Sequence, residues 1–177
     1  MNNNQLGKKI ISTKKLKKKN AELARQITED YKDKNPIFVS ILKSSVYFLA
    51  DLTRQLTIPL NIDFLGIERY PTGENSGQIH IEKNLDLKIK DRHVLIIDTI
   101  INTGLTHGYL VKNLQPRNPA SLKICTLIEN PEKRLVGLPI EYSGFTISQP
   151  KLFLVGYGLD YQENYRHLPY IVEYHKK

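Results

Sequence analysis

Two spacings of apolar residues alternate along this chain. Residues 13–31 place Leu16, Leu23 and Ile27 at intervals that bring them onto one face of a helix. Residues 37–42 instead form an almost unbroken apolar run, as in a strand that is buried on both faces. This pattern predicts helices at 13–31, 46–56 and 106–114 and strands at 37–42, 60–67, 78–85, 94–97 and 122–128.

The succession of strands and helices predicts the fold class. It favours an α/β domain in which helices flank a mainly parallel sheet. The length suits one domain, residues 1–177, with a sizeable core. A long polar segment interrupts the series, and we predict that residues 68–80 form a flexible lid. Ligands of such sheets bind at the carboxyl ends of the strands, where the polar turns of this chain fall.

Composition indicates the cellular compartment in which the protein is expected. The single cysteine, Cys125, lies in an apolar run, so neither a disulfide framework nor a cysteine-based metal site is expected. No apolar stretch approaches the ~18–20 residues of a membrane span, and the first residues lack the apolar region of a signal peptide. These features predict a soluble, cytoplasmic protein without a membrane partner.

The net charge of +8 is concentrated near the N-terminus. Seven of the 26 lysine and arginine residues lie in the basic segment 1–19, which contains no acid, and the other 19 nearly balance the 18 acidic residues. No aromatic residue is interleaved with these lysines to stack on bases. A solvated helix face is therefore a better interpretation than a nucleic-acid site, and binding of RNA by this segment is a third, lesser hypothesis.

The stretch 94–106 carries the first candidate chemistry. Four apolar residues lead into Asp98-Thr99, and the stretch ends in Asn102 and the turn Thr103-Gly104-Leu105-Thr106. A glycine lets backbone N–H groups crowd around an anion, and threonine hydroxyls add donors, so this turn predicts a phosphate site. Helix capping alone would also account for glycine and threonine at such a turn.

A second motif runs from Phe153 to Tyr170. It reads Phe-Leu-Val-Gly-Tyr-Gly-Leu-Asp-Tyr-Gln-Glu-Asn-Tyr-Arg-His-Leu-Pro-Tyr. This closely resembles Phe-Val-Val-Gly-Tyr-Gly-Leu-Asp-Tyr-x-Glu-x-Tyr-Arg-x-Leu-Pro-Tyr of the hypoxanthine-guanine phosphoribosyltransferases. The stretch 94–106 resembles the phosphoribosyl-pyrophosphate loop of the same family, and the resemblance extends over nearly the whole chain.

The resemblance implies both a fold and an activity. The fold would be that of a type I phosphoribosyltransferase, with a mainly parallel sheet, a lid hairpin and a small hood. The activity would be purine salvage, in which ribose-5-phosphate passes from phosphoribosyl pyrophosphate to hypoxanthine or guanine with the help of Mg²⁺. The family also implies a homo-oligomer, either a dimer or a tetramer.

On the phosphoribosyl side, the resemblance assigns roles to residues that match the family motifs. Asp98 and Thr99 stand where an acidic pair holds the ribose hydroxyls, and Asp98 is also an expected metal ligand. The turn Thr103–Thr106 would hold the 5′-phosphate. Lys43 and Ser44 match a Leu-Lys-Gly-x segment that meets pyrophosphate, although a serine N-cap would explain them equally well.

The lid and the C-terminal motif receive further roles. Tyr70 matches a lid tyrosine that closes over the reacting centre, with Arg69 in place of the preceding serine. Asp160 would bind Mg²⁺ and Arg166 would contact pyrophosphate, whereas a surface ion pair is the plainer alternative.

The base side of the expected site involves three residues. Phe153 would stack on the purine and Leu154 would offer backbone contacts to its edge, although core packing alone would explain the phenylalanine. Asn130 stands where the family has a lysine that donates to the 6-oxo group. An amide presents either its nitrogen or its oxygen, so the base preference stays open between 6-oxo and 6-amino purines.

Five residues depart from the family pattern at the expected site: Ser44, Arg69, Thr99, Asn102 and Asn130. Thr99 replaces an acid, which would cost about 1.5–3 kcal/mol, or about ten- to a hundred-fold in ribose binding. Asn102, in the expected catalytic position, replaces an aspartate thought to act as general acid or base toward purine N7, and an amide does not exchange a proton near neutral pH.

These departures leave two main hypotheses. The first is a working purine phosphoribosyltransferase, slow or with an altered base preference. The second is a catalytically impaired paralogue that binds nucleotide or a protein partner as a regulator. Adenine and orotate enzymes of the superfamily lack a carboxylate at the place of Asn102, which favours the enzyme.

Overall fold

Six strands form the central sheet in the order β4-β3-β2-β5-β6-β7 in a computed structural model that describes residues 5–69, 79–149 and 151–176. Neighbouring strands are parallel except for the antiparallel pair β3 and β4. The strands are β2 (Ile37–Leu42), β3 (Asn61–Arg69), β4 (Ile79–Lys83), β5 (His93–Ile101), β6 (Ser121–Glu129) and β7 (Tyr142–Thr146).

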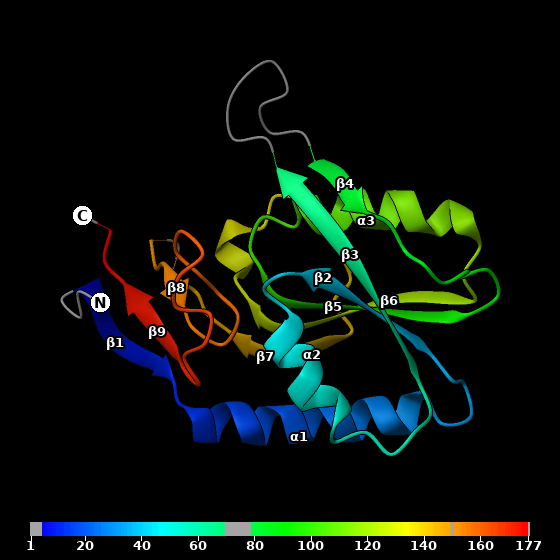
Figure 1. The fold of residues 1–177 in the computed structure, drawn as a ribbon, viewed down its shortest axis with the longest axis horizontal. Coiled ribbons are helices and arrows are strands. Elements are labelled where there is room, and N and C mark those ends of the chain that lie inside the picture. The colour runs from blue at the N-terminus through cyan, green and yellow to red at the C-terminus, as the bar shows by residue number, and fades with distance from the viewer. Residues whose placement is uncertain (1–4, 70–78, 150, 177) are drawn as a thin grey trace.

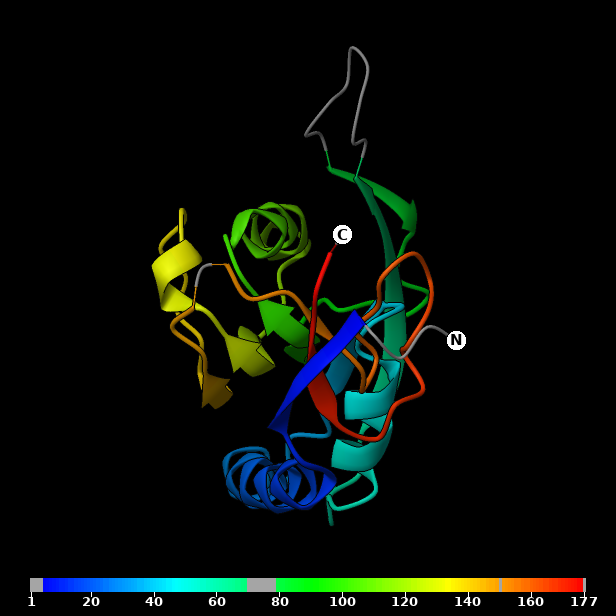
Figure 2. The same cartoon turned by 90° about the vertical axis from the view of Figure 1, so that its left-hand side faces the viewer.

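Helices cover both faces of this sheet. Figures 1 and 2 show α1 (Thr13–Asp30) and α2 (Val46–Thr53) on one face and α3 (Leu105–Leu114) on the other. Two 3-10 turns, η2 (Gln115–Arg117) and η3 (Pro131–Lys133), follow α3 and β6. The predicted mainly parallel α/β fold is therefore confirmed.

An N-cap hydrogen bond and an apolar face fix α1 against the sheet. Ser12 caps α1 by accepting a hydrogen bond from the backbone N–H of Lys15 at 3.3 Å. Leu16, Leu23 and Ile27 are buried in the core cluster that fills the space between α1, α2 and the sheet. A second core cluster, which includes Leu110, lies between α3 and the other face.

A small second sheet joins the two ends of the chain. It consists of β1 (Leu6–Ile11), β9 (Ile171–Tyr174) and β8 (Leu154–Val155), in the order β1-β9-β8 with antiparallel pairing. Figure 1 shows these strands together on one side of the molecule. This sheet corresponds to the expected hood, although the sequence pattern did not predict its strands. The lysines Lys8 and Lys9 of the basic segment lie in β1.

Two predicted boundaries were wrong by three residues or more. β5 continues past Ile97 to Ile101, because Ile100 and Ile101 still pair with Ile128 and Glu129 of β6. Asp98 and Thr99 therefore lie in a strand and not in a loop. The helix predicted to reach residue 56 ends at Thr53, after which the N–H groups of Gln55 and Leu56 donate to carbonyls three residues back and carry the chain on in overlapping turns.

The predicted lid corresponds to a hairpin at the edge of the central sheet. β3 and β4 form its arms, with Glu68 opposite His80 and Arg69 opposite Ile79. Tyr70 lies outside the described residues, so its lid role stays a prediction. Within the described residues, no helix is both long enough and apolar enough to cross a membrane.

Candidate active site

Two adjoining pockets open beside the carboxyl ends of the central strands. The first, which we call the turn pocket, has a volume of about 590 Å³ and lies beside the turn between β5 and α3. The second, the aromatic pocket, has a volume of about 190 Å³ and contains Phe153. Ile100, Asn102, Lys133, Leu159 and Asp160 line both. A single ligand can therefore extend from one pocket into the other.

The turn pocket is built around the start of α3. Gly104, the N-cap residue, has a φ of +80°, a left-handed conformation that glycine adopts readily. Thr103, Gly104 and Thr106 line the pocket, so the N-terminal end of α3 lies at its wall. Such a helix N-terminus favours a bound anion, as the sequence motif predicts.

Asp98 presents its carboxylate to the same pocket. Its Oδ1 accepts hydrogen bonds from the Thr99 backbone N–H at 2.7 Å and from Ser44 Oγ at 3.3 Å. Its Oδ2 lies 3.1 Å from His107 Nε2, although this contact lacks the alignment of a hydrogen bond. The Ser44 hydroxyl therefore serves Asp98 and does not cap α2, whose N-cap residue is Ser45.

Thr99 has a different environment from Asp98. Its side chain is fully buried, and its Oγ1 donates a hydrogen bond to the Ser44 carbonyl at 2.9 Å. It lines neither pocket. Successive residues of a strand point to opposite faces, which accounts for the separation of Thr99 from Asp98.

Two basic side chains that we expect to contact pyrophosphate, those of Lys43 and Arg166, both form ion pairs with Glu163. Lys43 Nζ and Arg166 Nη2 each lie 3.0 Å from an oxygen of Glu163, and Arg166 Nη2 also lies 2.9 Å from Asp160 Oδ1. The hydrogen bonds from Lys43 and Arg166 lower the pKa of the Glu163 carboxyl below its usual value. The peptide bond that precedes Lys43 is cis.

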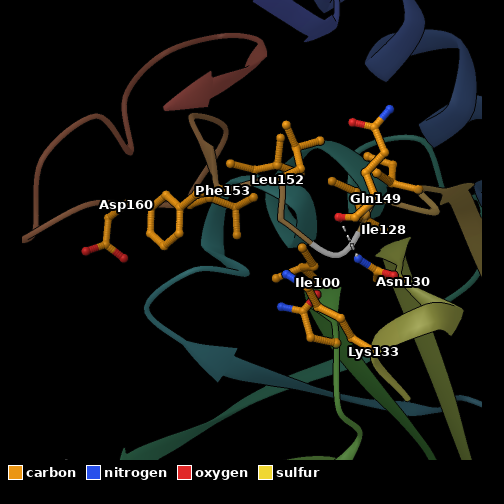
Figure 3. A pocket seen from close by; sticks show the side chains of 12 residues that line it. Ile100, Ile128, Asn130, Lys133, Gln149, Leu152, Phe153 and Asp160 are labelled. Atoms are coloured by element: carbon orange, nitrogen blue, oxygen red, sulfur yellow. Dashed lines mark hydrogen bonds between the residues drawn. The ribbon is translucent and has the colours of Figure 1, made fainter. Parts of the chain in front are cut away.

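The aromatic pocket lies between β6 and the C-terminal motif. Figure 3 shows Leu152, Phe153 and Asp160 along one side and Ile100 and Lys133 along another. The Asn130 amide nitrogen donates to the Gln149 carbonyl at 3.4 Å. The pocket therefore combines an apolar wall and an aromatic ring with a few polar groups, a common composition of small-molecule sites.

Close packing positions the C-terminal motif against the rest of the site. Gly158 has a φ of +97°, and a Cβ there would lie 1.9 Å from the Ser44 carbonyl oxygen. Tyr157 OH accepts from Asn20 Nδ2 and donates to Asp51, both at 2.7 Å. Burial, and then the bond to Asp51, raise the pKa of Tyr157 well above its usual value. The loop that carries Asp160 is therefore tied to α1, to α2 and to the segment of Ser44.

The structure brings most of the predicted residues together. Those that line one or both pockets are Ser44, Asp98, Asn102, Thr103, Gly104, Thr106, Asn130, Phe153, Leu154 and Asp160. Lys43, Thr99, Leu105 and Arg166 lie beside these residues without lining either pocket. Leu105 is 49 % exposed at the first position of α3, so only its backbone is suitably placed.

Sequence reasoning missed two ionisable residues that line the pockets. His107 lies in the first turn of α3 against Asp98, and it follows directly on the Thr-Gly-x-Thr turn. Lys133 lies at the end of η3 and lines both pockets. A lysine three positions after Asn130 gives no motif signal, because the turn that directs it inward is set by Pro131 and the tertiary packing.

The carboxylates fit a Mg²⁺ ion that arrives with a diphosphate. Asp98 and Asp160 both line the turn pocket, while the described residues contain no group of three or more metal-binding side chains. Mg²⁺ commonly uses one or two carboxylates and completes its shell with water and substrate phosphates. A site with two carboxylates is therefore adequate for such an ion.

Comparison with known proteins identifies the protein family to which this chain is similar. The sequence model described as the phosphoribosyl transferase domain matches residues 7–162. Hypoxanthine-guanine phosphoribosyltransferase of Streptococcus pneumoniae is 43% identical over 169 residues, covering 95% of this chain and 93% of that protein. The enzyme of the same name from Bacillus subtilis is 38% identical over 172 residues, covering 97% and 94%.

Solved structures agree with the sequence relatives. A hypoxanthine-guanine phosphoribosyltransferase of Bacillus anthracis superimposes with a TM-score of 0.88 at 36% identity, covering 96% of this chain and 99% of that chain. A hypoxanthine phosphoribosyltransferase of Staphylococcus aureus gives 0.90 at 38% identity, covering 97% and 92%. The chain therefore belongs to the hypoxanthine-guanine phosphoribosyltransferase family.

Proposed function

We propose that this protein transfers ribose-5-phosphate from phosphoribosyl pyrophosphate to a 6-oxopurine, hypoxanthine or guanine, in purine salvage. The observation that carries the proposal is the junction of the two pockets at Asn102 and Asp160. A phosphate-binding turn on one side and an aromatic wall on the other suit a substrate pair whose reacting atoms meet at that junction. The relatives named above support the same activity.

The residues of the turn pocket bind the donor substrate in this proposal. Thr103, Gly104 and Thr106 hold the 5′-phosphate at the start of α3, and Asp98 accepts hydrogen bonds from ribose hydroxyls. Asp98 and Asp160 hold Mg²⁺, which when bound neutralises charge on the leaving pyrophosphate. Lys43 and Arg166 are near enough to meet pyrophosphate by exchanging Glu163 for it.

The aromatic pocket binds the base. Phe153 stacks on the purine, while Leu154 and Asn130 offer contacts to its edge. The purine N9 forms a bond to C1′ as the C1′–oxygen bond breaks, and pyrophosphate leaves with the electron pair. The Asn102 amide can hydrogen-bond the base but cannot take its proton, which therefore passes to the leaving pyrophosphate. Positioning and exclusion of water supply most of the rate enhancement.

Turnover of purified protein tests the proposal. With Mg²⁺, phosphoribosyl pyrophosphate and hypoxanthine we expect formation of inosine monophosphate, measured by chromatography. Asp160→Asn should lower the rate at least about 100-fold, since it misplaces the reacting groups. Asp33→Asn, a change at an exposed site far from the pockets, is the matched control.

Calorimetric titration of phosphoribosyl pyrophosphate into the protein distinguishes the transferase from a nucleotide-binding regulator and from a protein that acts only through a partner. Mg²⁺-dependent binding of phosphoribosyl pyrophosphate without turnover of any purine would contradict the proposal and favour a nucleotide-binding regulator. Absence of binding would direct attention to a protein partner. A homo-oligomer and a cytoplasmic location stay predictions, the second supported by the single, buried Cys125.

A further inference from the structure

The aromatic pocket contains one cation among its described lining residues. Of the twelve residues that line it, Lys133 alone is positively charged and Asp160 alone is negatively charged. Lys133 is half-buried, and its ammonium has no hydrogen bond or ion pair to another described group. A partly buried ammonium without a partner is a donor that a ligand can engage.

Asn130 is poorly placed to supply that donor itself. It is only 4% exposed, and its Oδ1 is buried without a hydrogen-bond partner. Its Nδ2 already donates to the Gln149 carbonyl. Any contact from this side chain to a base is therefore limited to the remaining N–H of a neutral amide.

The backbone of η3 explains how Lys133 reaches the pocket. Its N–H donates to the Asn130 carbonyl at 3.2 Å, which closes a turn directly after β6. Figure 3 shows the Lys133 side chain extending from this turn beneath the pocket toward Ile100, and both residues line both pockets. The ammonium thus lies in the wall of the base site although its backbone is outside the strand.

From this geometry we propose that Lys133 determines the base specificity of the protein by donating a hydrogen bond to the 6-oxo group of the purine. The proposal rests on the transferase function proposed above. A carbonyl oxygen accepts a hydrogen bond from an ammonium, whereas a 6-amino group would present donors to it. A ring without a 6-substituent would leave the ammonium unpaired inside the pocket, which is unfavourable.

Three bases with the same ring system test the proposal: hypoxanthine, adenine and unsubstituted purine. We expect the wild-type protein to prefer hypoxanthine, and Lys133→Met to reduce the ratio of kcat/KM for hypoxanthine to that for purine about ten- to a hundred-fold. The KM for phosphoribosyl pyrophosphate should not change. Lys133→Arg, which keeps a cationic donor, should retain most of the preference.

Lys151→Met is the matched control, because Lys151 lies near Lys133 without lining the aromatic pocket. An unchanged base ratio in Lys133→Met would overturn the proposal, as would a loss confined to the KM for phosphoribosyl pyrophosphate. Equilibrium binding of inosine monophosphate and of purine ribonucleoside monophosphate gives the same ratio without turnover. If no base reacts but Lys133→Met still lowers that binding ratio, the transferase function fails and the role of Lys133 in recognition stands.

Discussion

The C-terminal motif and the end of β5 meet in one site, yet they follow the family pattern to different degrees. The motif 153–170 keeps nearly every family residue, whereas Thr99 and Asn102 in β5 and the turn after it depart from that pattern. The departures are not scattered. Ser44 donates to Asp98, and Thr99 donates to the Ser44 carbonyl, so two replaced side chains hydrogen-bond within one small network.

This difference teaches that an altered motif is not necessarily a decayed one. A lost acid normally leaves the surrounding donors without a partner. Here the threonine at that position satisfies a backbone carbonyl, and the serine that replaces a glycine contacts the remaining carboxylate. The end of β5 is thus internally satisfied, and the C-terminal motif closes against it through Gly158.

The strongest test restores the family acid at position 99. Thr99→Asp would bury a carboxylate beside the Ser44 carbonyl and remove the donor that this carbonyl now uses. We expect the free energy of unfolding in urea to fall by about 3 kcal/mol or more. Thr99→Val, which removes only the hydroxyl, should cost about 1–2 kcal/mol. Equal stability of Thr99→Asp and wild type would contradict the packing described for this side chain.

A second test restores the other family acid. Asn102 lines both pockets, so a carboxylate there can reach solvent and substrate. Asn102→Asp should raise kcat of the transfer by about 100-fold, the lower end of what a positioned acid or base contributes. The gain should be absent below the pKa of the new carboxyl, and a pH profile of kcat measures this. A fall in kcat would mean that the amide is better suited to this site than the family acid.

The contact between the two regions gives a third test. Gly158→Ala places a methyl group against the Ser44 carbonyl in a left-handed backbone conformation. The expected loss is about 2 kcal/mol in stability, of which about 1–2 kcal/mol comes from the backbone conformation. Gly137→Ala serves as the control, since nothing lies within 4 Å of a Cβ there. Similar midpoints for the two variants in urea would show that the motif does not depend on this approach.

The smallest expected effect concerns the Glu163 carboxyl. Its pKa is lowered in the folded protein, so its contribution to stability is present above the usual carboxyl pKa and is lost as the pH falls through the lowered value. Lys43→Met should move the Glu163 pKa up toward its usual range, as followed by a carbon-13 NMR titration. Because both side chains are exposed, added salt should have a similar but weaker effect. An unmoved pKa would assign the shift to Arg166.

Most of the central sheet was predictable because its longer strands are apolar and its helices have a clear period, but β7, with the mixed sequence Tyr-Ser-Gly-Phe-Thr, was not predicted. The hood was not, since β8 has only two residues and β1 includes Lys8 and Lys9, which obscure any strand pattern. β5 was predicted too short because Asp98 and Thr99 look like the start of a loop, while pairing with β6 continues beyond them.

In the candidate site, too, local motifs were predictable from the sequence and contacts between distant segments were not. Motif residues that share a turn, such as Thr103 and Gly104, were predicted together and lie together. Contacts between distant segments were not predictable from local pattern, since 120 positions separate Lys43 from Glu163 and 55 separate Ser44 from Thr99. The position of the Lys133 side chain in the pocket wall likewise depends on the direction of η3, which is set by tertiary packing.

The pairing of β1 with β9 has a consequence for the synthesis of the protein. β9 holds β8, which begins one residue after Phe153, and β9 is among the last described segments to be translated. The central sheet can form earlier, because β7 ends at Thr146. During translation the turn between β5 and α3 can therefore take its place at the sheet before β8 and β9 support the wall that carries Phe153, and a chain stopped before Ile171 would lack the strand that holds this wall.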